Sequence, residues 1–446
     1  MTTSLLTDHY ELTMVRAAMQ SGTHNRRSVF EMFSRRLPEG RRYGIVAGAG
    51  RLLDALEDFR FSDRDIDFLV RAGVADDVLV QWLTDYRFTG SVWGYPEGEA
   101  YFPGSPLLIV EGTFAEAVVL ETVALSIYNY DCAVAAAASR MTLMAAGRPC
   151  IEMGSRRTSE WSAVAAARAA YIAGFAQTSN LEAGARYGIP TAGTAAHSFV
   201  LLHDTEEEAF AAQLATLGEN TTLLVDTYDV EAAVRTAVEL TNGRIGAIRL
   251  DSGDLAELAV TTRQLLDELG APKTRIIVTS DLDEYQIAAL RSAPVDGFGV
   301  GTSLVTGSGA PTCGFVYKLV ARAASSAEDA PLIPVAKHSA GKVSVGGRKF
   351  ALRRLDARGR ATAEVIGIGA PPDGDYNDRP LLVPLVDHGE IVGREPLADA
   401  RARHDRAIAE LPMEARKMSR GEPAIETVML DDHGTPATNP YARSES

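Results

Sequence analysis

The sequence predicts an α/β protein built around a parallel β-sheet. Between residue 149 and about residue 320, short apolar strand patterns alternate with helical patterns, and repeated strand–helix units are typical of a parallel sheet. Polar or glycine residues follow nearly every strand pattern. Seven or eight such units favour a closed, TIM-like barrel, and an open doubly wound sheet is the alternative that periodicity leaves open.

Composition indicates a soluble globular protein. The chain has 446 residues, enough for two or more domains, and a net charge of −15 that argues against nonspecific nucleic-acid binding. We find no signal-peptide pattern and no apolar run of the roughly 20 residues that span a membrane. Cys132, Cys150 and Cys313 lack the spacing of a metal site or a disulfide framework. We therefore expect a cytoplasmic protein with reduced thiols and neither nucleic-acid nor membrane partners.

Residues 1–113 are predicted to form an N-terminal α+β domain. An extended run lies at 28–33, and helical patterns lie at 12–19, 52–56 and 61–87. Short strand patterns at 92–95, 100–102 and 107–110 are separated by proline and glycine, which predicts a small antiparallel sheet. The alanine-rich stretch 114–146 then predicts a bent or paired buried helix.

Residues 114–330 are predicted to form the α/β barrel domain with the active site. Its candidate strands lie at 150–153, 174–177, 189–192, 223–225, 247–250, 276–279 and 298–300. The C-terminal segment, 331–446, returns to strand character at 335–338, 342–345, 349–352, 381–386 and 390–392, and a helix is predicted at 396–410. The tail beyond Glu422 is rich in turn residues, which is typical of partial disorder.

The residues that follow the strands have the chemistry of a ligand pocket. The carboxyl ends of barrel strands converge on one face, so these residues are expected to surround one pocket. Asp251 and Asp254 would hold Mg²⁺ or accept hydrogen bonds from sugar hydroxyls. Arg156 and Arg249 are planar donors for a carboxylate or a phosphate, and His197 follows small residues that leave its ring accessible.

These features indicate a phosphorylated sugar with a metal ion, together with an anionic partner. Small residues after the last two strands would let backbone N–H groups approach a phosphate. The competing interpretation is structural: Asp254 caps the following helix, and Asp251 sits in a turn.

A set of motifs occurs in order along the chain, at Leu6–Tyr10, Phe30–Arg36, Glu152–Arg157, Thr178–Asn180, Gly193–His197, Ile248–Asp254 and Phe298–Thr302. As a set, these motifs resemble those of the nicotinate phosphoribosyltransferase family. The resemblance implies an irregular α/β barrel beside a second α+β domain built from both chain ends. It also implies a homodimer with a shared active site. The implied reaction joins nicotinate to 5-phosphoribosyl 1-diphosphate, with Mg²⁺ and with ATP as co-substrate, through a transient phosphohistidine.

The resemblance also implies roles for single residues. His197 would be the phosphorylated histidine, and the pocket argument makes Asp226 the candidate that orients its ring through the other nitrogen. Asp251 and Asp254 would lie near the ribose hydroxyls and Mg²⁺, with Asp251 catalytic. The remaining substrate-binding candidates are Tyr10, stacking on the pyridine from the neighbouring subunit, Met153, Arg156, Asn180 and Arg249, with Ser280, Asp281, Gly301 and Thr302 on the side of the 5′-phosphate.

The sequence departs from the family pattern at two places. Met153 stands where the family usually has phenylalanine, and the segment 343–349 lacks the usual proline before Gly-Arg-Lys. A nicotinamide-specific relative is the closest alternative, although the pair Arg156-Arg157 favours a carboxylate substrate. A quinolinate enzyme would need no phosphohistidine. A non-catalytic sensor of pyridine nucleotides would not need His197, Asp251 and Asp254.

Overall fold

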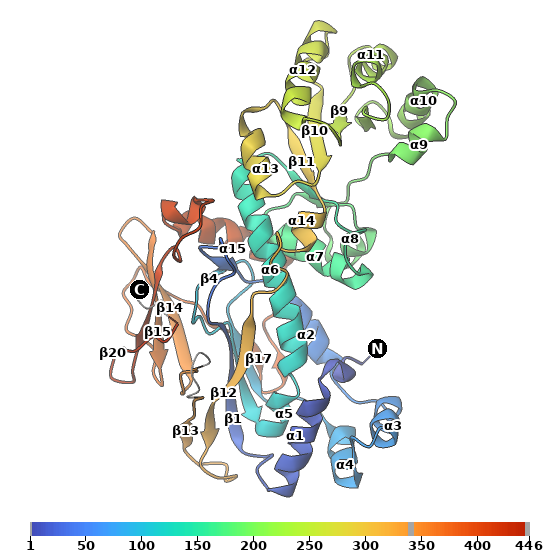
Figure 1. Cartoon of the computed structure of the whole chain (residues 1–446). Coiled ribbons are helices and arrows are strands. Elements are labelled where there is room, and N and C mark those ends of the chain that lie inside the picture. The colour runs from blue at the N-terminus through green and yellow to red at the C-terminus, as the bar shows by residue number, and fades with distance from the viewer. Residues whose placement is uncertain (1, 338–342, 442–446) are drawn as a thin grey trace. The chain divides into compact units, whose positions relative to one another are not determined.

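The structure is a computed structural model that describes residues 2–337 and 343–441 (Figure 1). The chain forms two compact units. Unit 1 comprises Met1–Ala136 and Ala310–Ser446, and unit 2 comprises Ala137–Gly309. Both chain ends therefore belong to unit 1, and the candidate active-site residues other than Tyr10 belong to unit 2.

Unit 1 is built on a seven-stranded sheet in the order β13-β12-β1-β5-β3-β17-β18. Its central strand β1 (Arg27–Ser34) is buried along nearly its whole length and pairs antiparallel with β12 (Phe315–Ala323) and β5 (Leu108–Thr113). The other strands are β3 (Ser91–Gly94), β13 (Leu332–Pro334), β17 (Val383–Asp387) and β18 (Glu390–Ile391). The antiparallel pairing predicted within 92–110 is confirmed for β3 and β5, but these strands belong to the larger sheet and do not form a small sheet of their own. The strand β4 (Ala100–Tyr101) pairs instead with β2 (Gly44–Ile45).

Helices provide the other layer of the unit 1 core. They are α1 (His9–Gln20), α2 (Ala49–Glu57), α3 (Asp63–Arg71), α4 (Asp77–Asp85), α5 (Phe114–Val118) and α6 (Glu121–Ala145), which continues into unit 2. The paired helix predicted for 114–146 is thus confirmed. By length and composition alone, Phe114–Ala145 would also suit a membrane span, but 67% of its most apolar window is buried inside the protein, as in a core helix.

A second sheet of unit 1 comes from the C-terminal segment, in the order β16-β14-β15-β19-β20. The strands are β14 (Lys349–Leu355), β15 (Ala361–Ile368), β16 (Arg379–Pro380), β19 (Glu426–Leu430) and β20 (Pro436–Ala437), and α15 (Leu397–Glu410) precedes the last two. Within the tail beyond Glu422, for which partial disorder is predicted, β19 and β20 are ordered strands, and β19 pairs in parallel with β15. The strands predicted at 335–338 and 342–345 are irregular where described, and residues 338–342 lie outside the described residues.

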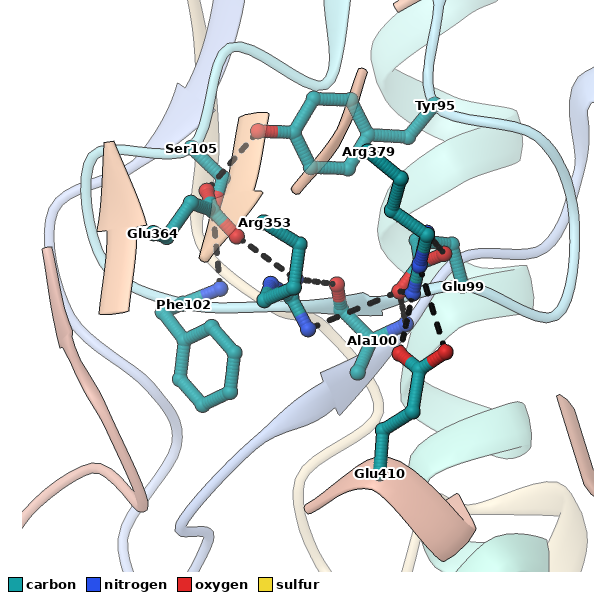
Figure 2. Close-up of polar contacts among 9 residues, drawn as sticks. All are labelled: Tyr95, Glu99, Ala100, Phe102, Ser105, Arg353, Glu364, Arg379 and Glu410. Atoms are coloured by element: carbon teal, nitrogen blue, oxygen red, sulfur yellow. Dashed lines mark hydrogen bonds and ion pairs between the residues drawn. The ribbon is translucent and has the colours of Figure 1, made fainter. Parts of the chain in front are cut away.

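A buried ion network joins the two sequence halves of unit 1 (Figure 2). Arg353 is fully buried, and its Nη2 donates to Glu364 Oε2 and to the Ala100 carbonyl, each at 2.8 Å. Arg379 pairs with the buried Glu99 at 2.6 Å. A buried charge is costly unless it is paired and hydrogen-bonded, so this network fixes β14–β16 against the segment around Glu99.

Unit 2 contains a six-stranded, fully parallel sheet in the order β7-β6-β11-β10-β9-β8. The strands are β6 (Cys150–Glu152), β7 (Gln177–Thr178), β8 (Thr222–Leu224), β9 (Ala247–Leu250), β10 (Arg275–Ser280) and β11 (Gly297–Val300). Its helices are α7 (Glu160–Ile172), α8 (Leu181–Tyr187), α9 (His197–Leu201), α10 (Glu206–Leu217), α11 (Val230–Thr241), α12 (Leu255–Glu268), α13 (Glu284–Ala289) and α14 (Thr302–Val305). The predicted α/β organisation is therefore confirmed.

Two predicted strands of unit 2 differ from the structure. The run 174–177 begins its strand late, because Gly174 adopts a left-handed turn conformation with φ +102°. The run 189–192 forms a single parallel bridge between Thr191 and Thr178, since Pro190 has no N–H for a ladder. In the described residues the hydrogen-bonded ladder ends at β7 and β8, so the closed barrel stays a prediction.

Candidate active site

The candidate residues of unit 2 lie at the carboxyl ends of neighbouring parallel strands. The ladder pairs Ser280 with Val300, and Val300 with Glu152, so β6, β10 and β11 end at the same edge. On the other side of β10, Leu250 pairs with Val278, and β9 ends there. The loops that follow these strands therefore stand side by side, as the sequence predicts.

Asp226 joins His197 to the loop that follows β9. His197 Nε2 lies 3.2 Å from Asp226 Oδ1, while Asp226 Oδ2 accepts hydrogen bonds from the Asp251 backbone N–H at 2.9 Å and from the Ser252 hydroxyl at 2.7 Å. The Asp226 side chain is only 3% exposed, whereas that of His197 is 41% exposed. The imidazole thus has one nitrogen fixed by a buried carboxylate and Nδ1 available to a ligand.

Arg249 and Asp251 are held together by Thr279. The Thr279 hydroxyl donates to Asp251 Oδ1 and accepts from Arg249 Nε at 3.2 Å, and Arg249 Nη2 lies 3.6 Å from the same carboxylate oxygen. Arg249 Nη1 donates to the hydroxyl of Thr194 at 2.8 Å and to the carbonyl of Ala195 at 3.3 Å. The guanidinium therefore connects the β9 loop with the segment that leads to His197.

Asp254 caps the helix α12. Its Oδ1 accepts hydrogen bonds from the backbone N–H groups of Ala256 and Glu257, both at 3.1 Å. The structural interpretation, in which Asp254 caps this helix, is thus confirmed. Among the described residues, however, Oδ2 of Asp254 and Oδ2 of Asp251 take part in no hydrogen bond or ion pair, so both carboxylates keep one oxygen for a ligand.

The end of β6 is organised around the buried Glu152. Its carboxylate accepts hydrogen bonds from the Thr178 hydroxyl and the Gly154 backbone N–H, and burial raises the pKa of Glu152. Asn180 caps α8 through Oδ1 at 2.9 Å and donates from Nδ2 to the Ser155 hydroxyl at 3.0 Å. Met153 donates its N–H to the Val300 carbonyl at 2.8 Å and is half-buried beside β11.

The ends of β10 and β11 carry the candidate residues for a phosphate site. Ser280 has φ +149°, a strained conformation for a residue with a side chain, and strain of this kind collects at functional sites. Gly301 is the N-cap residue of the short helix α14, and Thr302 is the exposed first residue of that helix. Asp281 is also exposed, so the loops at this edge are open to a ligand.

Two candidates are not fixed within this cluster. Arg156 is exposed and makes no side-chain hydrogen bond or ion pair with any described residue. Tyr10 lies on α1 in unit 1, where the residue is 46% exposed. Burial and the neighbouring Glu121 raise the pKa of Tyr10.

The structure adds residues that the sequence analysis missed. Thr279, Ser252 and Thr194 support the charged groups through hydroxyls, and Glu152 fixes two loops. The hydroxyl residues carry little signal, because serine and threonine are common in turns for structural reasons. An acidic residue within an otherwise apolar strand, as at Glu152, was the signal available, since buried carboxylates need specific partners.

These observations define an α/β protein in which carboxylate, arginine and histidine side chains gather at the carboxyl ends of parallel strands. Residues 5–129 match the N-terminal domain of nicotinate phosphoribosyltransferases. The chain is 54% identical to a nicotinate phosphoribosyltransferase of Mycobacterium tuberculosis, over 95% of this chain and 94% of that protein. It is 39% identical to the nicotinate phosphoribosyltransferase of Bacillus subtilis, over 79% and 73% of the two chains.

The fold agrees with these relatives. The crystal structure of human nicotinic acid phosphoribosyltransferase superposes with a TM-score of 0.82 at 26% identity, over 96% of this chain and 98% of the human chain. The chain belongs to the nicotinate phosphoribosyltransferase family.

Proposed function

We propose that this protein synthesises nicotinate mononucleotide from nicotinate and 5-phosphoribosyl 1-diphosphate, in the salvage of NAD. Relatives of 54% identity that are named for this activity support the reaction. The pyridine nitrogen of nicotinate forms a bond to the ribose C1, and the C1–O bond to the diphosphate breaks, so mononucleotide and diphosphate are released. The observation that carries the proposal is the connection of His197 through Asp226 to the Asp251 loop.

The strand-end side chains have distinct tasks in this reaction. Asp251 and Asp254 face the ribose hydroxyls and stabilise the positive charge that develops at C1. Arg249 and Arg156 bind the nicotinate carboxylate and substrate phosphate, because guanidinium forms charge-assisted hydrogen bonds with both groups. The other substrate contacts are those of Met153 and Asn180 near the pyridine, and of Ser280, Asp281, Gly301 and Thr302 at the 5′-phosphate.

Mg²⁺ fits the end of the site at Asp251 and Asp254. In each carboxylate, Oδ2 makes no hydrogen bond with a described residue. The described residues also include no group of three or more His, Cys, Asp or Glu side chains that would enclose a metal ion on their own. Mg²⁺ suits such a set, since it takes one or two carboxylates together with substrate phosphates. Bound there, it would neutralise charge on the diphosphate leaving group.

ATP is the co-substrate, and His197 is its acceptor. The Nε2–H group is held by Asp226, which leaves the lone pair of Nδ1 as the nucleophile. Nδ1 forms a bond to the γ-phosphorus while the bond to ADP breaks, and water later cleaves the N–P bond to give phosphate. Asp226 stabilises the cationic ring during this transfer.

The assembly is a cytoplasmic homodimer with a shared active site. Tyr10 stacks on the pyridine from the neighbouring subunit, a role supported by the residue's being 46% exposed. The parallel sheet of unit 2 closes into an irregular barrel, and the two chain ends together form the second domain.

The test incubates the protein with 5-phosphoribosyl 1-diphosphate, Mg²⁺ and either nicotinate or nicotinamide, with and without ATP. We expect nicotinate mononucleotide, formed faster with ATP. Turnover of nicotinamide alone would overturn the substrate, and no mononucleotide from either base would favour a non-catalytic sensor. His197→Ala should remove the ATP stimulation and leave a weak ATP-independent reaction, and Asp251→Ala should nearly abolish synthesis.

A further inference from the structure

We propose that Asp226 and Ser252 transmit the phosphorylation state of His197 to the loop that carries Asp251 and Asp254. The inference rests on the proposed function, because it explains how ATP hydrolysis would act on the phosphoribosyl site. It gives Ser252 a role as a positioning residue.

The two oxygens of Asp226 serve two different partners. Oδ1 contacts His197 Nε2 at 3.2 Å, and Oδ2 accepts from the Ser252 hydroxyl at 2.7 Å and the Asp251 N–H at 2.9 Å. Asp226 lies two residues after the end of β8, and the loop follows β9, the neighbouring parallel strand. With its side chain 3% exposed, Asp226 has little access to water that could replace one of these partners. A change at one oxygen must therefore be accommodated at the other.

Phosphorylation changes the first of these hydrogen bonds. In the neutral imidazole, Nε2–H is an ordinary donor to Asp226. When Nδ1 forms its bond to phosphorus and ADP leaves, the ring is cationic with its proton still on Nε2, and a charged donor makes a shorter and stronger hydrogen bond. Because the carboxylate group is rigid, a shorter hydrogen bond at Oδ1 also shifts Oδ2. Cleavage of the N–P bond by water releases phosphate and restores the neutral ring.

The same movement acts on the phosphoribosyl site. The Asp251 N–H and the Ser252 hydroxyl are bound to Oδ2, so the start of the loop follows the carboxylate. The Asp251 side chain also accepts from Thr279 and lies 3.6 Å from Arg249, so its position sets the wall that faces the ribose. A ligand shifts an equilibrium only through different interactions with two states, and these hydrogen bonds provide that difference.

Ser252→Ala is the discriminating variant. It keeps the contact between Asp226 and His197 but removes one of the two hydrogen bonds to the loop. Three quantities are measured: phosphohistidine from labelled ATP, ADP released per mononucleotide, and the KM for 5-phosphoribosyl 1-diphosphate with and without ATP. We expect wild-type phosphorylation, more ADP per mononucleotide, and an ATP effect on KM reduced about tenfold, within the roughly 5- to 150-fold range of coupling between sites.

Two control variants separate transmission from a general loss of structure. Ser252→Thr keeps the hydroxyl and should restore the wild-type ratio of ADP to mononucleotide. Thr261→Ala removes an exposed hydroxyl of α12 that bonds only within its own helix, at 3.1 Å to the Glu257 carbonyl and 3.2 Å to the Leu258 carbonyl, and should change nothing. Thermal melting confirms that each variant is folded.

Each remaining outcome is decisive. If Ser252→Ala is phosphorylated normally and keeps the wild-type ratio and KM shift, the transmission is wrong while the proposed function stands. If Ser252→Ala is not phosphorylated, Ser252 acts on His197 itself, which also overturns the inference. If the wild-type protein forms neither phosphohistidine nor mononucleotide, the proposed function fails first.

Discussion

Replacement of Gly299 by alanine tests whether Thr279 holds Asp251 and Arg249 in their working positions. Gly299 on β11 lies opposite Thr279 on β10, and a Cβ atom there would lie 2.4 Å from Thr279 Cγ2 and 2.8 Å from Met153 Sδ. Ordinary van der Waals contact begins at 3.4 Å, so Thr279 must retreat by about 1 Å. A displacement of about 1 Å in a group that positions a site can cost on the order of 100-fold in rate.

The assay measures kcat/KM for 5-phosphoribosyl 1-diphosphate together with the melting temperature. We expect kcat/KM to fall about 100-fold in Gly299→Ala, with about 1–3 kcal/mol of lost stability from overpacking. Gly193→Ala is the matched control, because Gly193 is another glycine of unit 2, yet a Cβ atom there meets nothing within 4 Å. Activity of Gly299→Ala within about threefold of wild type would refute the role given to Thr279.

Three further predictions concern stability and the metal. Arg353→Met should cost about 3–5 kcal/mol, because it leaves the Glu364 carboxylate buried without its cationic partner. Arg420→Met should cost little, since its 2.6 Å pair with Glu39 joins side chains that are 80% and 73% exposed; equal shifts in urea midpoints would contradict this reasoning. Burial raises the pKa of Glu11 from 4.5 to about 7, so the folded state holds a proton that the unfolded chain releases. The free energy of unfolding should therefore fall by about 3 kcal/mol as the pH rises from 4.5 to about 7, because one pKa unit is worth about 1.4 kcal/mol, and it should stay level above pH 7. Glu11→Gln should remove the slope in urea titrations across that range. Asp254→Asn keeps a capping side chain but removes the charge, so it should weaken Mg²⁺-dependent synthesis without lowering the melting temperature, and a lowered melting temperature with unchanged Mg²⁺ dependence would leave only the cap.

The parallel strands of unit 2 could be predicted because their signals are local. The strand Ala247–Leu250 is an apolar run closed by polar residues, and the structure has it at the predicted residues. Where a backbone rule opposed the pattern, the prediction failed: Gly174 turns the chain, and Pro190 lacks a donor. The position of Glu426–Leu430 depends on pairing with a distant strand, and composition contains no information about such a partner.

For the candidate site too, the sequence predicts what depends on local signals and misses what depends on contacts between segments. His197, Asp226 and Asp251 could be found because strand ends of a parallel sheet converge and these residues are chemically distinctive. The sequence does not indicate that Asp226 uses both oxygens, or that the Ser252 hydroxyl is one of its partners. Those facts depend on side-chain distances between two adjacent loops, which only the folded chain defines.

Asp254 illustrates why a structural and a chemical role need not compete. The cap uses one oxygen, and the two backbone N–H groups of α12 that it satisfies fix the direction of the other. A carboxylate held in this way loses less conformational freedom when a ligand binds, so the cap lowers the entropic cost of binding a metal or a ribose hydroxyl. Asp226 shows the same arrangement with both carboxylate oxygens in use, since one oxygen contacts His197 and the other accepts hydrogen bonds from the loop. In both residues the hydrogen bonds that stabilise the strand-end loops also position the group that would act on the substrate.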